Sequence, residues 1–187
     1  PRPATEAIIE YILKQQLPEN AKICDLGTGS GAIAISLAKE NPGWAISATD
    51  IQANALAMAA YNGQAHQCHN IEFIWSNWFE RLYARKFHLI VSNPPYIHPN
   101  DPHLSKDDVQ HEPRLALISE DEGLLDLKKI IHQAQNYLYP QGLLILEHGF
   151  DQQAQVIALL KEFGYQHVHG FHDHEGLPRF CVGQKHA

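Results

Sequence analysis

The fold of this chain is decided by the stretch Asp25-Leu26-Gly27-Thr28-Gly29-Ser30-Gly31. An apolar run at Lys22–Leu26 predicts a strand before it, and Ala32–Glu40 predicts a helix after it. Glycines between a strand and a helix let the backbone turn tightly and approach a ligand closely. Asp50 ends the next predicted strand, Trp44–Asp50, where a carboxylate can accept hydrogen bonds from both ribose hydroxyls of a nucleoside. The stretch therefore predicts a nucleoside-binding α/β fold.

The spacing of the glycines narrows the class of nucleoside. It reads Gly-x-Gly-x-Gly and not the GxGxxG of dinucleotide sites, and no Lys-Ser/Thr pair closes it as in a P-loop. Asp25 at the start of the loop suits a cationic ligand, such as the amino end or sulfonium of S-adenosylmethionine, better than a pyrophosphate. The alternative is a plain strand–helix turn, which needs at most one or two glycines.

The rest of the chain alternates between strand and helix patterns. Helices are predicted over Thr5–Gln16, Gln52–Gln64, Gly123–Leu138 and Gln152–Phe163, and strands over Ile71–Trp75, Phe87–Ser92, Gly142–Glu147, His167–Phe171 and Phe180–Gly183. A polar, irregular loop covers residues 97–121, and loops of this length are usually functional or disordered. Such alternation predicts a mostly parallel sheet with helices on both faces.

Composition limits the classes of function. The 187 residues are enough for one domain, and 14 Lys and Arg against 21 Asp and Glu give a net charge of −7, which argues against direct nucleic-acid binding. No apolar run approaches the length of a membrane helix, and no signal peptide is apparent. The three cysteines form no CxxC pair, so free thiols in a reducing cytoplasm are expected. The chain begins at Pro1, and we expect it to be a piece of a longer protein.

The turn Asn93-Pro94-Pro95-Tyr96 is the most specific feature of the sequence. It follows a predicted strand and so faces the ligand edge of the sheet. The prolines stiffen the turn. The Asn93 side-chain oxygen and the Pro94 carbonyl can each accept one hydrogen of a planar NH₂ group, and Tyr96 can pack on that group. This arrangement would orient the nitrogen and stabilise the positive charge that grows on it during attack on a methyl sulfonium.

These motifs resemble the class I S-adenosylmethionine-dependent methyltransferases and, more closely, the HemK/PrmC family. That family methylates the side-chain amide nitrogen (N5) of the glutamine in the GGQ motif of class 1 peptide chain release factors, which act in translation termination. The residues that carry the resemblance are Pro1-Arg2-Pro3-Ala4-Thr5-Glu6, Asp25–Gly31, Asp50, Ser76–Phe79, Asn93–Tyr96, Glu112-Pro113-Arg114-Leu115-Ala116-Leu117, Asp121-Glu122-Gly123-Leu124, Leu146-Glu147-His148-Gly149, and Asp173, Gly176 and Arg179. The spacing of the last three fits this family better than its sister, which methylates a ribosomal protein glutamine.

The resemblance implies a fold, a cofactor and a site. The fold is a Rossmann-like, seven-stranded, mostly parallel sheet with an antiparallel strand near the C-terminus. Residues 1–187 would be the catalytic domain, without the N-terminal helical domain with which the family docks its substrate. The implied S-adenosylmethionine ligands are Asp25, Gly27, Thr28, Gly29, Ser30, Gly31, Asp50, Asn77, Trp78 and Asn93. The implied substrate-binding residues are Asn93, Pro94, Pro95 and Tyr96, of which Asn93, Pro94 and Tyr96 are catalytic.

Two residues depart from the family pattern. Ala4 stands where the family usually has Glu, and Asn77 where it often has Asp. The Asn77 side-chain oxygen can still accept a hydrogen bond from adenine N6. We therefore expect a site whose contact with adenine is altered but which is still active. We expect a monomer whose protein substrate is a class 1 release factor, with no membrane association.

Several alternatives stay open at this level. A methyltransferase of a DNA or RNA amino group can use the same turn on a flipped base, but it would call for a basic groove. A non-catalytic S-adenosylmethionine-binding module would not need the Asn93 turn. Four histidines between His167 and His174 suggest a metal, yet alternation along a strand explains their spacing, and we expect none. Trp75 and Cys24 are expected in the core.

Overall fold

The computed structural model describes residues 2–94 and 123–187, and a seven-stranded sheet in the order β3-β2-β1-β4-β5-β7-β6 forms its centre. The strands are β1 (Lys22–Leu26), β2 (Ala45–Asp50), β3 (Ile71–Trp75), β4 (Phe87–Ser92), β5 (Leu138–Glu147), β6 (Gln166–His172) and β7 (Pro178–Gln184). The helices are α1 (Pro3–Leu13), α2 (Ala32–Glu40), α3 (Ala53–Ala65), α7 (Leu125–Ala134), the 3₁₀ turn η2 (Gln135–Tyr137) and α8 (Gln153–Glu162).

The sheet is parallel except at one strand. β1 pairs in parallel with β2 and β4, β2 with β3, and β4 with β5. Among the described strands only β7 is antiparallel to its neighbours, which are β5 and β6. The fold class expected from the sequence, including the antiparallel strand near the C-terminus, is therefore confirmed.

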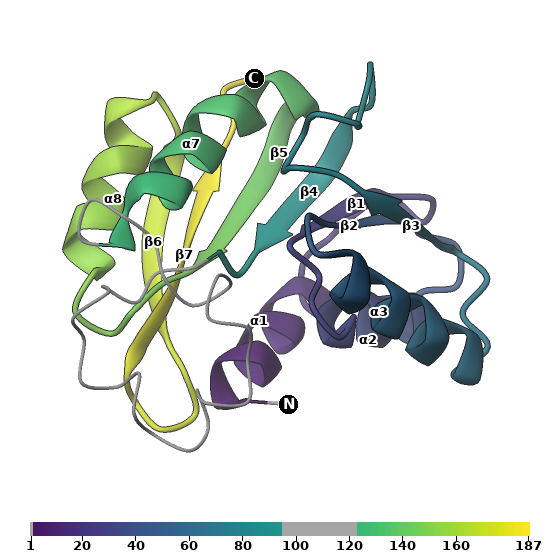
Figure 1. Ribbon diagram of the computed structural model, residues 1–187. Helices are drawn as coiled ribbons and strands as arrows, with labels where there is room; N and C mark the ends of the chain where they lie inside the picture. Colours follow the sequence, from purple (N-terminus) through teal and green to yellow (C-terminus); the bar gives the residue numbers. More distant parts are fainter. Residues whose placement is uncertain (1, 95–122) are drawn as a thin grey trace.

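Helices cover both faces of the sheet (Figure 1). On one face α1 and α2 pack on a cluster that includes Ile8, Leu37, Ile46 and Leu89, all buried. On the other face α7 and α8 pack on a second cluster that joins their apolar stripes to alternate residues of β1, β4, β5 and β7. Alternation of side chains along each strand supplies both cores, because every strand between the edges is covered on both faces.

Most element boundaries follow the sequence, and the largest difference lies at the end of α7. The predicted helix Gly123–Leu138 stops instead at Ala134, tightens into η2 and gives way to β5 at Leu138. Leu138 pairs with Phe87 of β4 and is fully buried, so it contributes to the sheet and not to a further helical turn. The first helix also ends early, at Leu13, although its start at Pro3 fits the preference of proline for the first helical turn.

The strand order creates one place for a ligand. The chain builds outward from β1 through β2 to β3, then returns to the other side of β1 with β4 and continues to β5. Open α/β sheets bind ligands at such a reversal, outside the carboxyl ends of the strands. The carboxyl ends of β1 and β4 are Leu26 and Ser92, which pair directly in register. The glycine loop and the Asn93 turn begin immediately after these two residues.

Candidate functional site

The glycine loop after β1 adopts a conformation that requires its three glycines. Gly27, Gly29 and Gly31 have φ angles of +68°, +57° and +87°, in the left-handed region that side chains disfavour. A Cβ at Gly31 would stand 3.1 Å from Ile35 Cδ1 and 3.2 Å from Ala59 Cβ, so this glycine also lets α2 and α3 approach. A Cβ at Gly29 would have nothing within 4 Å. The backbone at Gly29 is therefore open for a ligand to approach.

Asp25 is a buried carboxylate beneath the loop, with 2% of its surface exposed. Thr28 Oγ1 donates to Asp25 Oδ2 over 2.8 Å, and the Ala34 backbone N–H also donates to this carboxylate. Burial raises the pKa of Asp25 to about 6. The two hydrogen bonds lower this pKa, and the charge of Asp50 raises it by a smaller amount. The structure thus places a buried carboxyl group beneath the loop, where the sequence predicts the cationic end of a ligand.

Asp50, at the end of β2, is tied to the same loop. Its Oδ2 accepts the Gly29 N–H over 2.9 Å, and its Oδ1 accepts the Gln52 N–H, also over 2.9 Å. Each carboxylate oxygen can accept a second hydrogen bond. The two backbone bonds orient the carboxylate toward the open Gly29 backbone while leaving acceptor capacity for a diol.

The turn after β3 places Trp78 beside the glycine loop, and Asn77 precedes Trp78 in this turn. Ser76 is buried, its Oγ donates to the Trp78 carbonyl over 2.9 Å, and it accepts the Arg81 N–H over 3.0 Å. Trp78 itself has a φ of +52°. Its ring lies beside Gly27, where a Cβ would come within 3.4 Å of Trp78 Cζ3. The Asn77 amide donates to Glu80 Oε1 over 3.4 Å, which leaves its own side-chain oxygen as an acceptor.

The Asn93 turn is fixed to the glycine loop by a residue that the sequence reasoning missed. Ser92 is fully buried, and its Oγ donates to the Leu26 carbonyl over 2.9 Å. This bond ties the last residue of β4 to the last residue of β1. Asn93 is half-buried and Pro94 is buried. Pro95 and Tyr96 lie outside the described residues, as do Glu112 and the histidines of the 97–121 loop.

The predicted ligand-binding residues that the structure describes therefore lie at the carboxyl ends of the parallel strands β1 to β4. Ser30 joins them through the backbone, since its carbonyl accepts a hydrogen bond from Asn62 of α3 over 3.0 Å while its side chain is exposed. The sequence carries no distinctive signal for Ser92 or Ser76, because a single serine at a strand end is common. Their roles depend on partners 66 residues away for Ser92 and on a local turn for Ser76.

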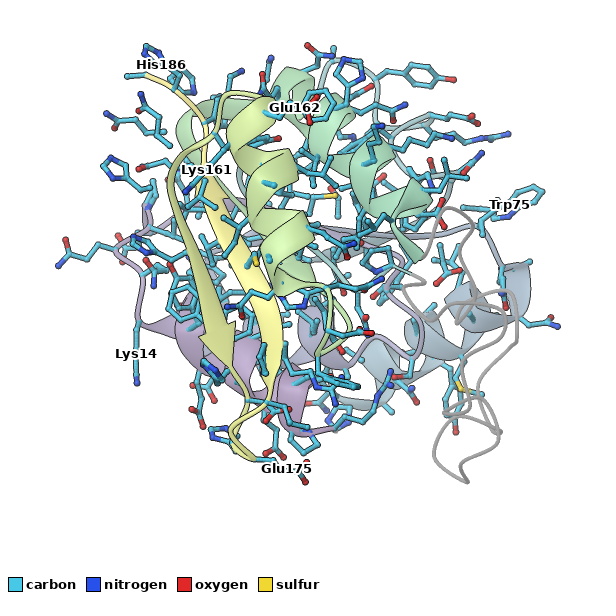
Figure 2. All side chains as sticks on the ribbon, turned by 90° about the vertical axis from the view of Figure 1, so that its left-hand side faces the viewer. Lys14, Trp75, Lys161, Glu162, Glu175 and His186 are labelled. Carbon is cyan, nitrogen blue, oxygen red and sulfur yellow. The ribbon has the colours of Figure 1, made fainter. Side chains whose placement is uncertain are left out.

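Two predictions about single residues have different outcomes. Cys24 is fully buried in β1, as expected. Trp75 is not a core residue: 57% of its surface is exposed, and Figure 2 shows it extending away from the protein body. It ends the edge strand β3, its Nε1 donates to the Ile51 carbonyl over 2.7 Å, and the Arg81 guanidinium lies 5.7 Å from its ring centre. An edge position with one hydrogen bond explains the exposure.

The four histidines between His167 and His174 lie in β6 and in the turn that joins β6 to β7. Within residues 2–94 and 123–187 no three metal-ligating side chains come together. His174 instead lies 3.4 Å from Glu10 of α1. The hairpin is organised by Asp173, which accepts the backbone N–H groups of Glu175 and Leu177 and the Arg179 guanidinium. These bonds lower the pKa of Asp173 against the effect of its burial.

The sequence matches one family model and several curated relatives, all of them methyltransferases. The family model of the methyltransferase small domain matches residues 3–111. A release factor glutamine methyltransferase of Coxiella burnetii is 44% identical over 99% of this chain, and one of Pseudomonas aeruginosa is 45% identical over 98%. The chain spans 66% and 67% of the lengths of these two relatives, and 64% of a similar Shewanella oneidensis protein.

Solved structures extend the similarity of fold. A methyltransferase from Pyrococcus furiosus has a TM-score of 0.71 at 18% identity, with 99% of this chain and 83% of that one covered. TrmN from Thermus thermophilus has a TM-score of 0.66 at 21% identity, with 97% of this chain and 48% of that one covered.

Proposed function

The chain belongs to the methyltransferase small domain family and to its release factor glutamine methyltransferases, and from this membership we propose that the protein methylates the side-chain amide nitrogen of the GGQ glutamine in class 1 release factors. One observation carries the proposal. The Asn93–Pro94 turn is bound through Ser92 to the end of β1, directly beside the glycine loop. A rigid acceptor for a planar NH₂ group and a nucleoside-binding loop thus share one edge of the sheet.

The glycine loop fits S-adenosylmethionine by its own geometry. The backbone at Gly29 is open, Asp50 retains acceptor capacity for ribose hydroxyls, and buried Asp25 favours the positive end of the ligand. Trp78 beside Gly27 would line the adenine side, with the Asn77 oxygen as an acceptor for adenine N6. S-adenosylmethionine, when bound, supplies an electrophilic methyl group and leaves as S-adenosylhomocysteine.

The Asn93 turn would hold the amide that receives the methyl group. The Asn93 side-chain oxygen and the Pro94 carbonyl each accept one N–H of the glutamine amide, which fixes the nitrogen in line with the methyl group. Partial positive charge develops on the nitrogen as the N–C bond forms. The same two oxygens stabilise that charge more strongly than the neutral amide, which is the differential binding that catalysis needs. One amide proton leaves to solvent after transfer, so no strong base is required. We further propose that Pro95 and Tyr96 complete this pocket.

The organisation of the whole protein is part of the proposal. We assign residues 1–187 as the catalytic domain, acting as a monomer in the cytoplasm on a protein substrate, with no direct contact to nucleic acid or membrane. Within residues 2–94 and 123–187, no helix combines the length and the apolar character that crossing a bilayer requires. The net charge of −7 does not favour a phosphate backbone as the main partner.

The test is transfer of labelled methyl from S-adenosylmethionine by the full-length protein. The substrates are a class 1 release factor, the same factor with its GGQ glutamine replaced by alanine, and duplex DNA. We expect label on the intact factor alone. Asn93→Ala should abolish most of this transfer, and the matched control Asn54→Ala, at an exposed position of α3, should leave it unchanged. Label on DNA, or equal label on both factors, would overturn the proposal.

A further inference from the structure

A buried histidine–cysteine pair lies behind the candidate site, outside the machinery assigned so far. His148 follows β5 and Cys181 lies in β7, and both are fully buried. His148 Nε2 is 3.3 Å from Cys181 Sγ, and His148 Nδ1 is 2.8 Å from the Gly149 carbonyl oxygen. The two residues are 33 positions apart, and the pairing of Leu146 with Cys181 across β5 and β7 brings them together.

The chemistry of the partners fixes the protonation of both side chains. A carbonyl oxygen only accepts, so His148 Nδ1 must carry a hydrogen. Nε2 of the neutral ring is then an acceptor, and the Cys181 thiol is its donor. Burial raises the pKa of Cys181 to about 12, which keeps the thiol protonated at neutral pH. The pair is therefore a donor–acceptor chain that runs from the thiol through the ring to the backbone of Gly149.

The same turn is held by two further bonds. The His148 backbone N–H donates to the Arg179 carbonyl over 2.8 Å, and the Gly149 N–H donates to Gln152 Oε1 over 2.9 Å. Residues 147–149 are thus anchored to β7 and to the residue before α8. These bonds restrain the backbone of the turn, and the one from His148 Nδ1 requires a hydrogen on that nitrogen.

This turn lies next to the Asn93 turn. Leu26, Ser92, Leu146 and Cys181 form one row across four neighbouring strands, and all four are fully buried. Ser92 is the last residue of β4, directly before the Asn93 turn, and Leu146 is the second-last residue of β5, directly before residues 147–149. We expect a shift of the 147–149 turn to reach Asn93 and Pro94 through the paired strands β5 and β4, which join the two turns at Leu146 and Ser92.

We propose, resting on the methyl transfer proposed above, that His148 and Cys181 are positioning residues: the thiol holds neutral His148 in its Nδ1–H tautomer, and the ring holds the 147–149 turn against the Asn93–Pro94 turn. Neither residue takes a proton from the amide, because the Nε2 lone pair is occupied by the thiol. Protonation of His148 would place a hydrogen between Nε2 and a sulfur that is only a weak acceptor, and would leave a cation buried.

The surroundings of His148 favour the neutral ring. Burial lowers the pKa of His148, and the Arg179 guanidinium of β7 lowers it further, whereas the Gly149 carbonyl and the Asp151 carboxylate act in the opposite sense. Among the described residues, Cys181 contacts the ring and Glu147 precedes it in the sequence, and both are also titratable. Since the folded-state pKa lies below the ordinary 6.5, the arrangement is complete above that pH and is lost as the pH falls through the lower value.

The first arm of the test follows His148 directly. Two-dimensional ¹⁵N NMR of the imidazole in the full-length protein distinguishes the two tautomers and gives the pKa of the ring. We expect the Nδ1–H form at pH 7.5. Cys181→Ala should raise the pKa of His148 by about 0.5–1, the equivalent of one lost hydrogen bond, and Cys181→Ser should restore it. An Nε2–H tautomer in the wild type would overturn the proposal.

The second arm measures methyl transfer to the release factor against pH. For Cys181→Ala we expect kcat/KM to fall roughly three- to tenfold at pH 7.5, with its acid limb displaced to higher pH and the KM for S-adenosylmethionine unchanged. Cys181→Ser should behave as the wild type. Cys24→Ala, which removes a sulfur that is equally buried in β1, should leave the acid limb in place.

Two outcomes separate the positioning role from the proposed function. A Cys181→Ala profile identical to that of an active wild type would overturn the positioning role alone. Absence of transfer to the release factor by the wild type would overturn the proposed function and the positioning role with it, while the NMR arm would still decide the tautomer. Asp25 also titrates near pH 6, and the NMR arm distinguishes His148 from it.

Discussion

Replacing Asp25 by asparagine should stabilise the protein while weakening its cofactor site. Burial raises the pKa of Asp25 from 3.8 to about 6, so the charged form is disfavoured in the folded state. That difference corresponds to about 3 kcal/mol of destabilisation at pH 7.5, where both the folded and the unfolded chain carry the charge. The asparagine side chain of the Asp25→Asn variant would keep the shape, and the Thr28 hydroxyl can either donate to it or accept from it.

The stability difference between Asp25→Asn and the wild type should depend on pH with a defined sign. Because the folded-state pKa is raised, the folded protein takes up a proton before the unfolded chain does, and the cost of the wild-type carboxylate is relieved as the pH falls from 6 toward 4. The Asp25→Asn variant should therefore exceed the wild type by about 3 kcal/mol at pH 7.5, and the difference should shrink at lower pH. In a chain of this size that is roughly 6–12 °C in Tm at neutral pH.

The assay is urea unfolding followed by circular dichroism between pH 4.5 and 8, with the difference between variant and wild type taken at each pH. This difference removes the contribution of every group that titrates alike in both proteins. Glu162→Gln, at an exposed carboxylate of α8 (Figure 2), is the control and should change nothing. Isothermal titration with S-adenosylmethionine should give weaker binding to Asp25→Asn. A variant less stable than the wild type at pH 7.5, or a difference independent of pH, would refute the reasoning.

Three further outcomes follow from the geometry. Asn93→Ala should lower kcat for methyl transfer by at least about 10²-fold, which is the usual effect of removing one group that stabilises transition-state charge. The rate of labelled-methyl transfer measures this loss, and a clearly smaller loss would contradict the prediction. Gly31→Ala should destabilise the fold by more than Gly29→Ala, since both have positive φ and only position 31 also crowds its neighbours; urea unfolding should give about 1–2 kcal/mol for strain alone at position 29. Asp173→Asn should be less stable than the wild type at pH 7. The difference should shrink as the pH falls below the ordinary 3.8 and vanish below the lowered pKa of Asp173, because the carboxyl is then neutral in both states; a series of thermal unfolding curves from pH 7 downward would test this.

Local pattern was sufficient for the elements around the site. β1, β3, β4 and α2 begin and end at the predicted residues, because the apolar pattern of each stops at a glycine, a polar residue or an Asn-Pro pair. The positions of the glycine loop after β1 and of Asp50 at the end of β2 could be predicted from the same local pattern. Asn93 and Pro94 follow β4 directly, as the sequence predicts, whereas Pro95 and Tyr96 lie outside the described residues.

Pairing between distant segments could not be predicted. Leu138 has the spacing of a helical residue, and only its partner Phe87 across β4 assigns it to a strand. The exposure of Trp75 depends on β3 being at the edge of the sheet, which the sequence does not state. His148 and Cys181 look like unrelated residues until the register of β5 and β7 joins them.

The position of β7 has a consequence for how the protein is made. Among the described strands β7 comes after all the others in the sequence, yet it lies inside the sheet between β5 and β6. While the ribosome is still adding residues before Pro178, β5 has an open edge and β6 has no neighbour to pair with. Such an edge is a template for pairing with other chains. The nascent chain therefore cannot join β5 to β6 until β7 has emerged from the exit tunnel, and a product that stalls before Pro178 would expose an aggregation-prone edge.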